Sequence, residues 1–514
     1  MILSVLFAAF ALLADANKVP AKIGTHMSVD AARKHVSYLA SDEMRGRDTP
    51  SAELEKAAAY IASEFKRFGL EPVGGSYFHE YQLERLDLAL PCSLLLVRGA
   101  DTTEATLKAD FVPMEHTGEG DVRNAPIVFC GFGIEAPEFS YNDYAGIDAR
   151  GAVAIILRGE PENEDTTRFA GKRFTRHASL TTKIAVARKH GVQALLVVDA
   201  VRVKRKPFVS GYPWPSIFPK VPKSSRPIVL PLDEVRLPAL HVGERVFGAL
   251  VGSVDSLVWL TTVIDSTLTP HSFAVADAHA TLSVKLEREK ITLRNVVGMI
   301  RGSKVPTEYA VMGAHYDHIG TGKPVGGDSI YNGADDNGSG TTGLLLAAED
   351  IARCGVKPDR SIVFVAFSGE EKGLLGSKAY VQTSPLSLDK CVSMTNMDMI
   401  GRCENSQLSI GGNNRCPDLI AINEEENAQL KSPLTLAYNI EQYFFRSDQA
   451  SFAKKRIPVI FYFTGEHADY HKVGDEVEKL DLENLVNIAR LATRVTWRAT
   501  TMPRSRYIPS GFEE

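Results

Sequence analysis

Four short apolar runs in the second half of the chain constrain its fold most. Each is about the length of a buried strand, and helical patterns at Thr341–Arg353 and Leu482–Val495 follow two of them. The runs are Tyr309–Gly313, Ser361–Phe367, Cys391–Met397 and Ile457–Phe463. Alternation of this kind predicts an α/β domain, with an open, mainly parallel sheet and helices on both faces.

The first part of the chain has a different character. A length of 514 residues predicts two or three domains. Val29–Ala40 and Pro50–Phe68 have helical patterns, whereas residues from about 80 to 300 carry short β-rich runs with one clear helix at Thr182–His190. Lys206–Pro231 is rich in Pro, Ser and aromatic residues and predicts a long surface loop. The early helices can complete the domain that resumes near Thr292, so we expect the middle region to be an insertion.

The N-terminus has the pattern of a signal peptide. Ile2 to Ala14 are almost wholly apolar, and Ala14-Asp15-Ala16 matches a small-x-small cleavage site. The run is too short to span a bilayer, and no other segment has the pattern of a membrane span. We expect residues 1–16 to be removed and the protein to be secreted or periplasmic. The alternative is a buried N-terminal helix.

Charge and cysteine content exclude some classes. A net charge of −5 and a pI near 6.3 give no electrostatic argument for binding nucleic acid or an anionic membrane. Six cysteines in a chain of this size do not form a disulfide scaffold. Cys403 and Cys416 flank a Gly-Gly turn, and the sequence leaves open whether they pair.

Residue types that bind metal follow each of the four apolar runs. A further acidic pair, Asp335-Asp336, stands where a helix opens at Asn337-Gly338-Ser339-Gly340. The other clusters are His315-Tyr316-Asp317-His318, Glu370-Glu371, Asp398, and Glu466 to His471. The carboxyl ends of strands line the ligand crevice of an open α/β sheet. One such cluster is usually a cap or a solvated group, but several carboxylates buried together need cations.

The ligand types indicate divalent metal. Mixed imidazole and carboxylate ligands without cysteine favour zinc and leave manganese and cobalt open. Two ions roughly 3.5–4 Å apart share a water, make it hydroxide near neutral pH and polarise a carbonyl. Asp317 can hold the second ring nitrogen of His315, and of Glu370 and Glu371 one can bind metal while the other takes a proton. The helix start after Asp336 favours a carboxylate there.

With these residues assembled, the sequence resembles the di-zinc exopeptidase family, which contains secreted bacterial aminopeptidases, glutamate carboxypeptidases, glutaminyl cyclases and the transferrin receptor. The resemblance implies that His315 and Asp398 bind one metal, Glu371 and His471 bind the other, and Asp336 bridges them. The matching stretches are His315-Tyr316-Asp317, Asp336 to Gly340, Glu370 to Ser377, Asn396 to Gly401, Tyr470-His471 and the opening Leu39 to Arg47.

The resemblance also implies roles for other residues. Glu370 becomes the general base, Asp317 supports His315, and Tyr470 donates a hydrogen bond to the tetrahedral intermediate. Four nearby groups are expected to lie behind the ligands or at the surface and not to bind metal: Asp335, His318, His467 and Asp469. Relatives commonly have Ser-Asp-His where this chain has Ser447-Asp448-Gln449, which puts the shape of any substrate side pocket there in doubt.

The middle region resembles a protease-associated domain. Taken with the signal-peptide pattern and the catalytic motifs, this resemblance predicts how the chain is organised. Residues 1–16 form the signal peptide, 25–115 and 286–500 the two parts of the catalytic domain, 116–285 the insert, and 501–514 a C-terminal tail. The matching stretches of the insert are Ile127 to Gly133, Tyr144 to Asp148, Gly151 to Gly159 and Lys183–Asp199. We expect the insert to be a rigid lid without chemistry of its own.

The function that follows is that of a metal-dependent exopeptidase with peptide substrates. An aminopeptidase that releases N-terminal residues through a hydroxide bound to two metal ions is expected first. A carboxypeptidase or dipeptidase, a glutaminyl cyclase and a non-catalytic receptor-like protein are the alternatives. The sequence leaves open the side-chain preference, the native metal and the oligomeric state.

Overall fold

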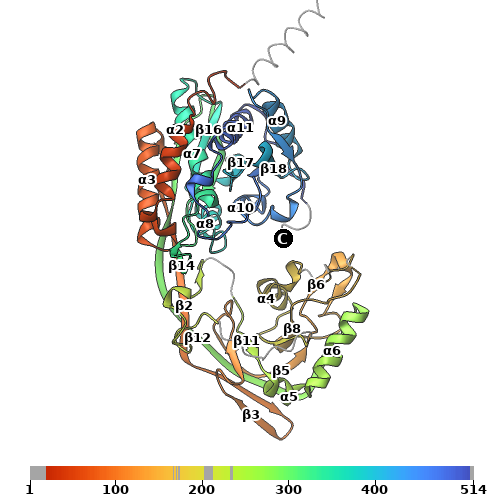
Figure 1. Ribbon diagram of the computed structural model, residues 1–514. Helices are drawn as coiled ribbons and strands as arrows, with labels where there is room; N and C mark the ends of the chain where they lie inside the picture. The colour runs from red at the N-terminus through yellow and green to blue at the C-terminus, as the bar shows by residue number, and fades with distance from the viewer. Residues whose placement is uncertain are drawn as a thin grey trace, which may run out of the picture. The chain divides into compact units, whose positions relative to one another are not determined.

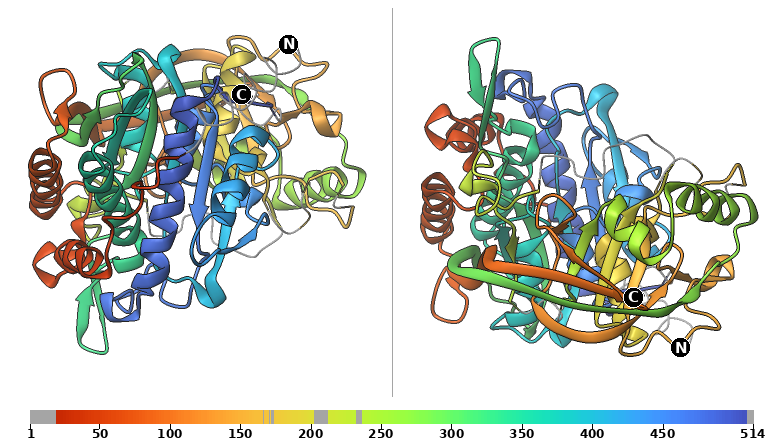
Figure 2. Two further views of the ribbon diagram at one scale, coloured as in Figure 1. Left: turned by 90° about the horizontal axis from the view of Figure 1, so that it is seen from above. Right: turned by 90° about the horizontal axis from the view of Figure 1, so that it is seen from below.

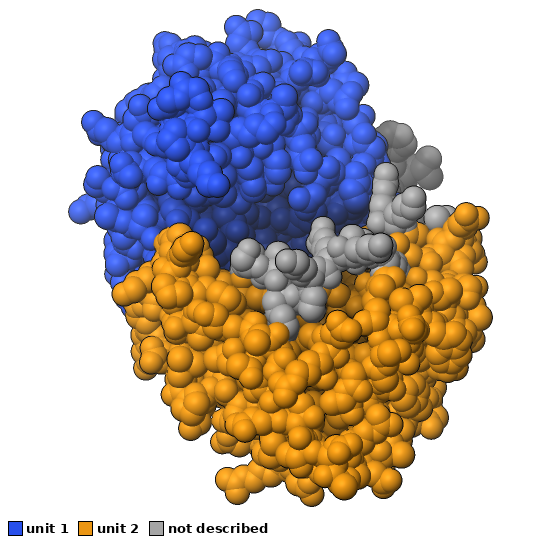
Figure 3. Space-filling view, turned by 60° about the horizontal axis from the view of Figure 1, so that its bottom comes forward, with its two compact units in different colours: residues 1–82, 292–514 blue, residues 83–291 orange. Residues whose placement is uncertain are grey.

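The computed structural model describes residues 19–165, 167–169, 171, 174–201, 212–231 and 236–509. The chain divides into two compact units (Figures 1 and 3). Unit 1 comprises Met1–Gln82 and Thr292–Glu514, and unit 2 comprises Leu83–Ile291. The expected signal peptide at 1–16 and the last residues of the expected tail lie outside the described residues.

The sheet of unit 1 has a parallel centre. β16 (Arg360–Phe367), β13 (Val305–His315), β17 (Cys391–Met397) and β20 (Val459–Phe463) are parallel neighbours in that order. Antiparallel strands flank this centre: the end of β12 (Phe273–Ile300) pairs with β16, and β18 (Gln407–Gly411) pairs with β20. β19 (Thr435–Ala437) is parallel to β18 at the edge.

Helices cover both faces of this sheet (Figure 2). On one face, α7 (Gly340–Arg353) and α11 (Leu482–Thr501) pack on the strands, and α2 (Val29–Leu39) and α3 (Ala52–Phe68) pack on α7. α8 (Leu375–Thr383) and α10 (Gln449–Ala453) share the hydrophobic core of the other face, and α9 (Pro417–Ala428) packs on α11. This arrangement confirms the predicted α/β class.

Local sequence explains where the elements begin and end. The Ser28 and Ser51 hydroxyls accept hydrogen bonds from the N–H groups of Ala31 and Leu54, which cap α2 and α3. Gly69 ends α3 with a φ of 84°, a conformation that glycine adopts without strain. The central strands are buried along almost their whole length, which is why they are continuous apolar runs.

Unit 2 has a parallel strand centre of its own. β5 (Gly120–Phe129), β8 (Val153–Arg158), β9 (Ala194–Asp199) and β11 (Ala239–Val242) are parallel neighbours, and β4 (Phe111–Pro113) is antiparallel to β11. Its helices are α4 (Leu180–Lys189), α5 (Glu244–Leu250) and α6 (Val254–Thr267). The expectation of one clear helix therefore missed α5 and α6.

The bounds of unit 2 differ from those expected for the insert, 116–285. Leu86, Leu94 and Phe111 belong to the same hydrophobic core as β5 and β8, so the compact unit begins earlier. The chain passes between the units inside two long strands, β2 (Phe78–Arg98) and β12. The shorter strands are β1 (Glu71–Pro72), β3 (Asp101–Ala105), β6 (Glu135–Ala136), β7 (Tyr141–Asn142), β10 (Ile228–Val229), β14 (Thr321–Val325) and β15 (Asp328–Ile330).

The described part of the surface loop expected at Lys206–Pro231, residues 212–231, is mostly irregular and partly exposed, but it is anchored to the core. Trp214 is fully buried, and its indole N–H donates to the Pro113 carbonyl at 2.7 Å. β10 pairs with β2 in an antiparallel register. Trp214, an aromatic residue among prolines, therefore anchors this loop to the core of unit 2.

Among the described residues no single helix is long and apolar enough to cross a membrane, although the bent pair α5 and α6 reaches that length and composition together. Cys403 and Cys416 are both buried and unpaired, as are the other four cysteines.

Candidate metal centre

The predicted ligands converge where the parallel strands of unit 1 end. His315 is the last residue of β13, Asp398 follows β17 directly, and Glu370 and Glu371 stand in the turn after β16. His471 lies in the segment that follows β20. Because neighbouring parallel strands deliver their carboxyl ends to the same edge, residues distant in sequence meet there.

The fifth predicted ligand, Asp336, comes from the short helical turn η5 (Ala334–Ser339) ahead of α7. The backbone N–H groups of Asp335 and Asp336 both donate to the carboxylate of Asp475, with distances of 3.0 Å to each of its oxygens. Asp475 is fully buried. These bonds fix the backbone of η5, so the Asp336 side chain keeps its direction toward the strand ends.

Asn337 ties η5 to the end of β17. Its Oδ1 accepts from the N–H of Gly340 at 2.9 Å and from that of Met399 at 3.1 Å, and its Nδ2 donates to the Met397 carbonyl at 3.0 Å. One side chain therefore sets the position of Asp336, next to it in sequence, relative to Asp398.

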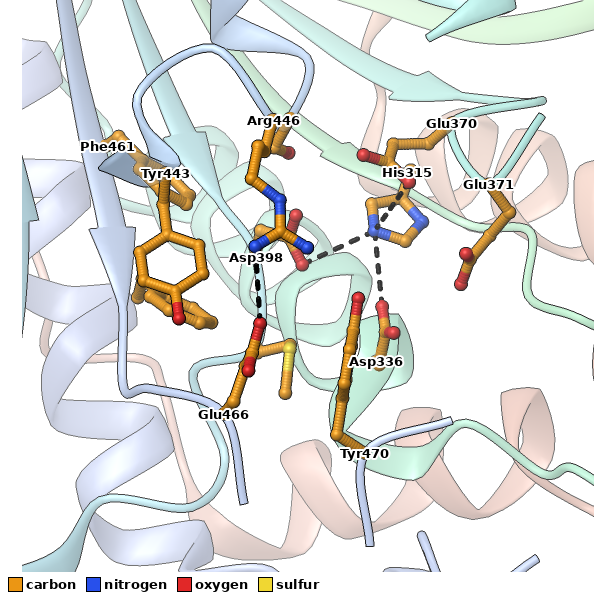
Figure 4. Close-up of a pocket in the computed structure, with 13 residues that line it drawn as sticks. His315, Asp336, Glu370, Glu371, Asp398, Tyr443, Arg446, Phe461, Glu466 and Tyr470 are labelled. Atoms are coloured by element: carbon orange, nitrogen blue, oxygen red, sulfur yellow. Dashed lines mark hydrogen bonds and ion pairs between the residues drawn. The ribbon is translucent and has the colours of Figure 1, made fainter. Parts of the chain in front are cut away.

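The ligand atoms form two groups that share Asp336. Figure 4 shows the group around His315, with dashed lines to Asp336 and Asp398. Nε2 of His315 lies 3.4 Å from Oδ1 of Asp336 and 3.3 Å from Oδ1 of Asp398. Nε2 of His471 lies 3.1 Å from Oδ2 of Asp336 and 3.2 Å from Oε2 of Glu371. The two oxygens of Asp336 thus face different groups, which is the arrangement of a bridging carboxylate.

The chemistry of these groups fits divalent cations. Nε2 of His471 lies close to two carboxylate oxygens, yet it makes no hydrogen bond, as expected of atoms that converge on a common cation. Burial and repulsion from Glu371 raise the pKa of Asp336 to about 6. Two divalent ions would remove this repulsion between buried carboxylates.

Glu370 stands beside the ligands but turns away from Glu371. Its Oε2 is 4.0 Å from Nε2 of His315, and its backbone N–H donates to Oδ1 of Asp317 at 3.1 Å. Burial raises the pKa of Glu370 well above its usual range, against the pull of His315 and with repulsion from Asp398. A carboxylate of raised basicity beside the ligands is suited to accept a proton.

Asp317 contacts both His315 and Glu370, but its backbone carbonyl, and not its carboxylate as expected, lies nearest to the His315 ring. Its carboxylate lies 3.7 Å from Nδ1 of His315, whereas its backbone carbonyl lies 3.2 Å from the same nitrogen. Oδ2 of Asp317 accepts from the Thr49 hydroxyl at 2.8 Å. The carbonyl therefore orients the His315 ring, and the carboxylate connects Thr49 with the backbone of Glu370.

The remaining predicted residues take up distinct positions. The Tyr470 ring stacks on His471, with centroids 4.0 Å apart, and lines the pocket over the ligands. Asp469 pairs with Arg402 and Lys479. Two further groups expected to be peripheral, Asp335 and His467, pair with each other at 3.2 Å, and Oδ1 of Asp335 accepts from the Gly401 N–H at 2.7 Å.

His318 is not a surface group, because it is in direct contact with the proposed ligand Glu371. It is fully buried, and its Nδ1 lies 2.8 Å from Oε1 of Glu371 and 3.7 Å from Oδ2 of Asp336. The two oxygens of Glu371 are therefore divided between His318 and His471. Within the described ranges, two clusters could hold a cation: one consists of His318, Asp336, Glu371 and His471, and the other of His315, Glu370 and Asp398.

Sequence reasoning missed Arg47. Its guanidinium is fully buried and donates to the carbonyls of Tyr316, Asn332 and Gly333 at 2.8 to 3.0 Å, and to that of Leu39. Burial lowers its pKa to about 10, against the attraction of Asp317 and Asp336. Arg47 connects the start of the chain to two loops that carry ligands. The only signal was its place in the opening stretch Leu39 to Arg47.

Gln449, where relatives commonly have His, has a structural partner on each side. Its Oε1 accepts from Nδ2 of Asn396 at 2.7 Å, and its Nε2 donates to the Phe444 carbonyl at 2.8 Å. Gln449 thereby holds the segment with Phe444 against β17. The adjoining Tyr443 and Arg446 line the pocket over the ligands.

This fold and this site define a class: an α/β protein whose parallel strand ends carry paired imidazole–carboxylate groups for two cations. Residues 295–496 match the model of Peptidase family M28, so the chain contains a Peptidase M28 family domain. The match confirms the resemblance found from the motifs.

Individual relatives cover only part of the chain. A probable zinc metalloprotease of Pyrenophora tritici-repentis is 25% identical over 257 residues, which is 42% of this chain and 58% of the relative. Leupeptin-inactivating enzyme 1 of Streptomyces exfoliatus is 30% identical over 175 residues, 34% of this chain and 36% of that protein. The chain thus spans little more than half the length of the first of these curated relatives.

A solved structure is similar over nearly the whole chain. The aminopeptidase from Aneurinibacillus sp. strain AM-1 aligns with 95% of this chain and 96% of its own, at 20% identity and a TM-score of 0.51. At this identity the similarity establishes the fold.

Proposed function

We propose that the chain is a metal-dependent exopeptidase, an aminopeptidase that releases N-terminal residues from peptides. The observation that carries the proposal is the Asp336 carboxylate, whose two oxygens face separate imidazole–carboxylate groups. Relatives named as zinc metalloproteases and the motifs of a Peptidase M28 family domain support zinc as the metal.

The proposed ligand sets follow the two groups. His315, Asp336 and Asp398 would hold one ion, and Asp336, Glu371 and His471 the other. When bound, two such ions acidify water near neutral pH and polarise a carbonyl. The fit rests on the donor types, on their burial, and on the absence of hydrogen-bond geometry at Nε2 of His471.

The chain's own residues supply the proton transfers. Glu370 would take a proton from the attacking water and pass it to the leaving amine, and the bond from its backbone N–H to Asp317 fixes its position. Tyr470 lines the same pocket and would donate its hydroxyl hydrogen to the oxygen of the tetrahedral intermediate.

The charges around the pocket favour an amino terminus over a carboxyl terminus. A carboxypeptidase needs a cation to hold the terminal carboxylate of its substrate. Arg446 is the only Arg or Lys among the residues that line the described pocket, and Glu466 already pairs with it at 3.4 Å. The described lining therefore has no Arg or Lys without a carboxylate partner that could hold a terminal carboxylate, which favours an amino terminus.

The test compares peptides with free and with blocked amino termini, before and after treatment with a chelator. We expect hydrolysis of free-amino peptides only, lost on chelation and restored by zinc. Release of C-terminal residues from blocked peptides would replace the proposal with a carboxypeptidase. Cyclisation of N-terminal glutamine without hydrolysis would indicate a glutaminyl cyclase, and no catalysis with metal bound would indicate a binding protein.

Two proposals concern the rest of the chain. We propose that the region expected as the insert, within Leu83–Ile291, is a protease-associated domain that affects which substrates are selected. We also propose that residues 1–16 are a signal peptide and that the protein is secreted or periplasmic, on the basis of the apolar run and the Ala14-Asp15-Ala16 site. N-terminal sequencing of native protein tests the second, with an expected start near Asn17.

A further inference from the structure

The pocket over the ligands has an apolar wall on the side of β20. Met399, Phe461 and Phe463 are buried in one hydrophobic cluster, and Tyr443 packs against it. Ring centroids of Tyr443 and Phe463 are 5.2 Å apart, and those of Phe461 and Phe463 are 5.7 Å apart. An uncharged side chain of a substrate gains favourable burial against such a wall.

One ion pair interrupts the apolar lining. Nη1 of Arg446 lies 3.4 Å from Oε1 of Glu466, and both residues line the pocket together with the wall and the ligands. The Arg446 guanidinium also lies over the Tyr443 ring, 5.0 Å from its centroid. Figure 4 draws Arg446 and Glu466 between Tyr443 and the ligand His315.

The backbone on each side of this pair is fixed by other bonds. Thr464, two residues before Glu466, donates its N–H and its hydroxyl to the Met399 carbonyl at 2.9 and 2.7 Å. Gln449 holds the Phe444 carbonyl, two residues before Arg446. The side chains of Arg446 and Glu466 are 57% and 40% exposed, so the pair contributes little to stability and can be altered without loss of the fold.

We propose that the Arg446–Glu466 pair is a charge filter that restricts the pocket to uncharged N-terminal side chains. The inference rests on the proposed aminopeptidase function and assigns the preference of the same site. A charged side chain loses water as it enters, and it gains no partner while each rim charge is already paired. Glu466 also repels an acidic side chain of the substrate, and Arg446 repels a basic one.

The filter predicts a reciprocal change of preference. Arg446→Gln leaves Glu466 unpaired beside the apolar wall and creates a partner for Lys or Arg at the substrate N-terminus. Glu466→Gln leaves Arg446 unpaired and creates a partner for Glu or Asp. The double variant has no charge at either position, and it should again prefer N-terminal Leu and Phe over charged N-terminal residues.

The experiment measures kcat and KM of the zinc-loaded full chain with p-nitroanilides of Leu, Phe, Lys and Glu. In Arg446→Gln the ratio of kcat/KM for Lys over Leu should rise about 5- to 10-fold, and in Glu466→Gln the ratio for Glu over Leu should rise equally. Arg506→Gln, which breaks an exposed Arg506–Asp418 pair away from the pocket lining, should leave all ratios unchanged.

The outcomes separate the filter from the proposed function. Unchanged ratios in both single variants, or a uniform loss over all four substrates, would overturn the filter while the aminopeptidase function stands. Wild-type protein that hydrolyses none of the four substrates, with two zinc ions bound, would overturn the aminopeptidase function itself. Circular dichroism and thermal unfolding of each variant check that the fold is intact.

Discussion

Two buried carboxylates, Asp336 in unit 1 and Asp143 in unit 2, have opposite surroundings. Oδ2 of Asp143 accepts from the N–H groups of Phe132 and Ile134 at 3.0 Å, and its Oδ1 accepts from the Tyr141 hydroxyl at 2.8 Å. The Asp336 side chain instead faces imidazoles and other carboxylates.

The difference distinguishes a structural carboxylate from a ligand. Donors of the chain itself saturate the Asp143 oxygens, so that site is complete as folded. The Asp336 group gathers more acceptors than donors, and only cations balance it. Burial alone therefore identifies neither role; what decides is whether the surrounding groups donate hydrogen bonds or compete for a cation.

Metal removal should have the largest effect and should act on unit 1 alone. We expect chelation to abolish peptidase activity and zinc to restore it, because the Asp336 group holds more acceptors than donors and needs cations to balance it. Bound metal stabilises a fold by mass action, by about 4 kcal/mol at a thousandfold excess over Kd. Hydrogen exchange should therefore accelerate around η5 on chelation and stay unchanged around Asp143. Equal changes in hydrogen-exchange protection around η5 and around Asp143 would contradict the distinction between a ligand and a structural carboxylate.

Glu370→Gln tests the proton acceptor while it preserves the ligands. We expect kcat to fall by about 10²–10⁴-fold with two metal ions retained and KM little changed, since general acid–base catalysis is typically of that size. Glu371→Ala is the matched variant, and its metal content should fall together with its activity. Equal loss of metal in both variants would mean that the roles of the two glutamates are misassigned.

Asp143→Ala tests the saturated carboxylate. Two backbone N–H groups and the Tyr141 hydroxyl would lose their acceptor, so the free energy of unfolding of unit 2 should fall by about 3–5 kcal/mol. Denaturant unfolding followed by hydrogen exchange measures this change. Metal content of the folded protein should stay at the wild-type level. A loss of bound metal would show that Asp143 is not purely structural.

His318→Gln should have the smallest effect of the four. His318 holds Oε1 of Glu371 at 2.8 Å, and loss of a group that orients a ligand typically weakens metal binding about 10–100-fold. Competition with a chromogenic chelator measures the affinity directly. His177 in unit 2 makes a similar contact, 2.9 Å to Glu138, so His177→Gln is the control and should leave metal affinity unchanged.

Predicted elements and observed elements agree best where one strong pattern decided them. β17 has the bounds predicted from its apolar run, and α7 and α11 begin within one residue of their predicted starts. α5 was missed because seven residues are too few to reveal a helical period, and α6 because its exposed face carries apolar residues such as Val258 and Trp259.

For the candidate site too, residues with a local sequence signal were predicted and residues that act through distant contacts were missed. Residue types after the strands and at one helix start indicated the clusters, and the family resemblance selected the five ligands within them. The structure brings all five together: His315, Asp336, Glu371, Asp398 and His471. Arg47 and Asp475 were missed because their partners are far away in the sequence. Arg47 bonds to residues 285 and 286 positions later, and Asp475 bonds to a residue 140 positions earlier. The partners are backbone groups, which carry no residue-specific pattern.

The sequence by itself determined the α/β class, the strand ends and the kinds of ligand, because hydrophobic period and side-chain chemistry are local properties of the chain. Only the tertiary structure decided which Asp336 oxygen faces which imidazole, that His318 rather than solvent contacts Glu371, and that Arg446 meets Glu466 beside an aromatic wall. These contacts join segments from separate strand ends, and their distances depend on how the sheet aligns those ends.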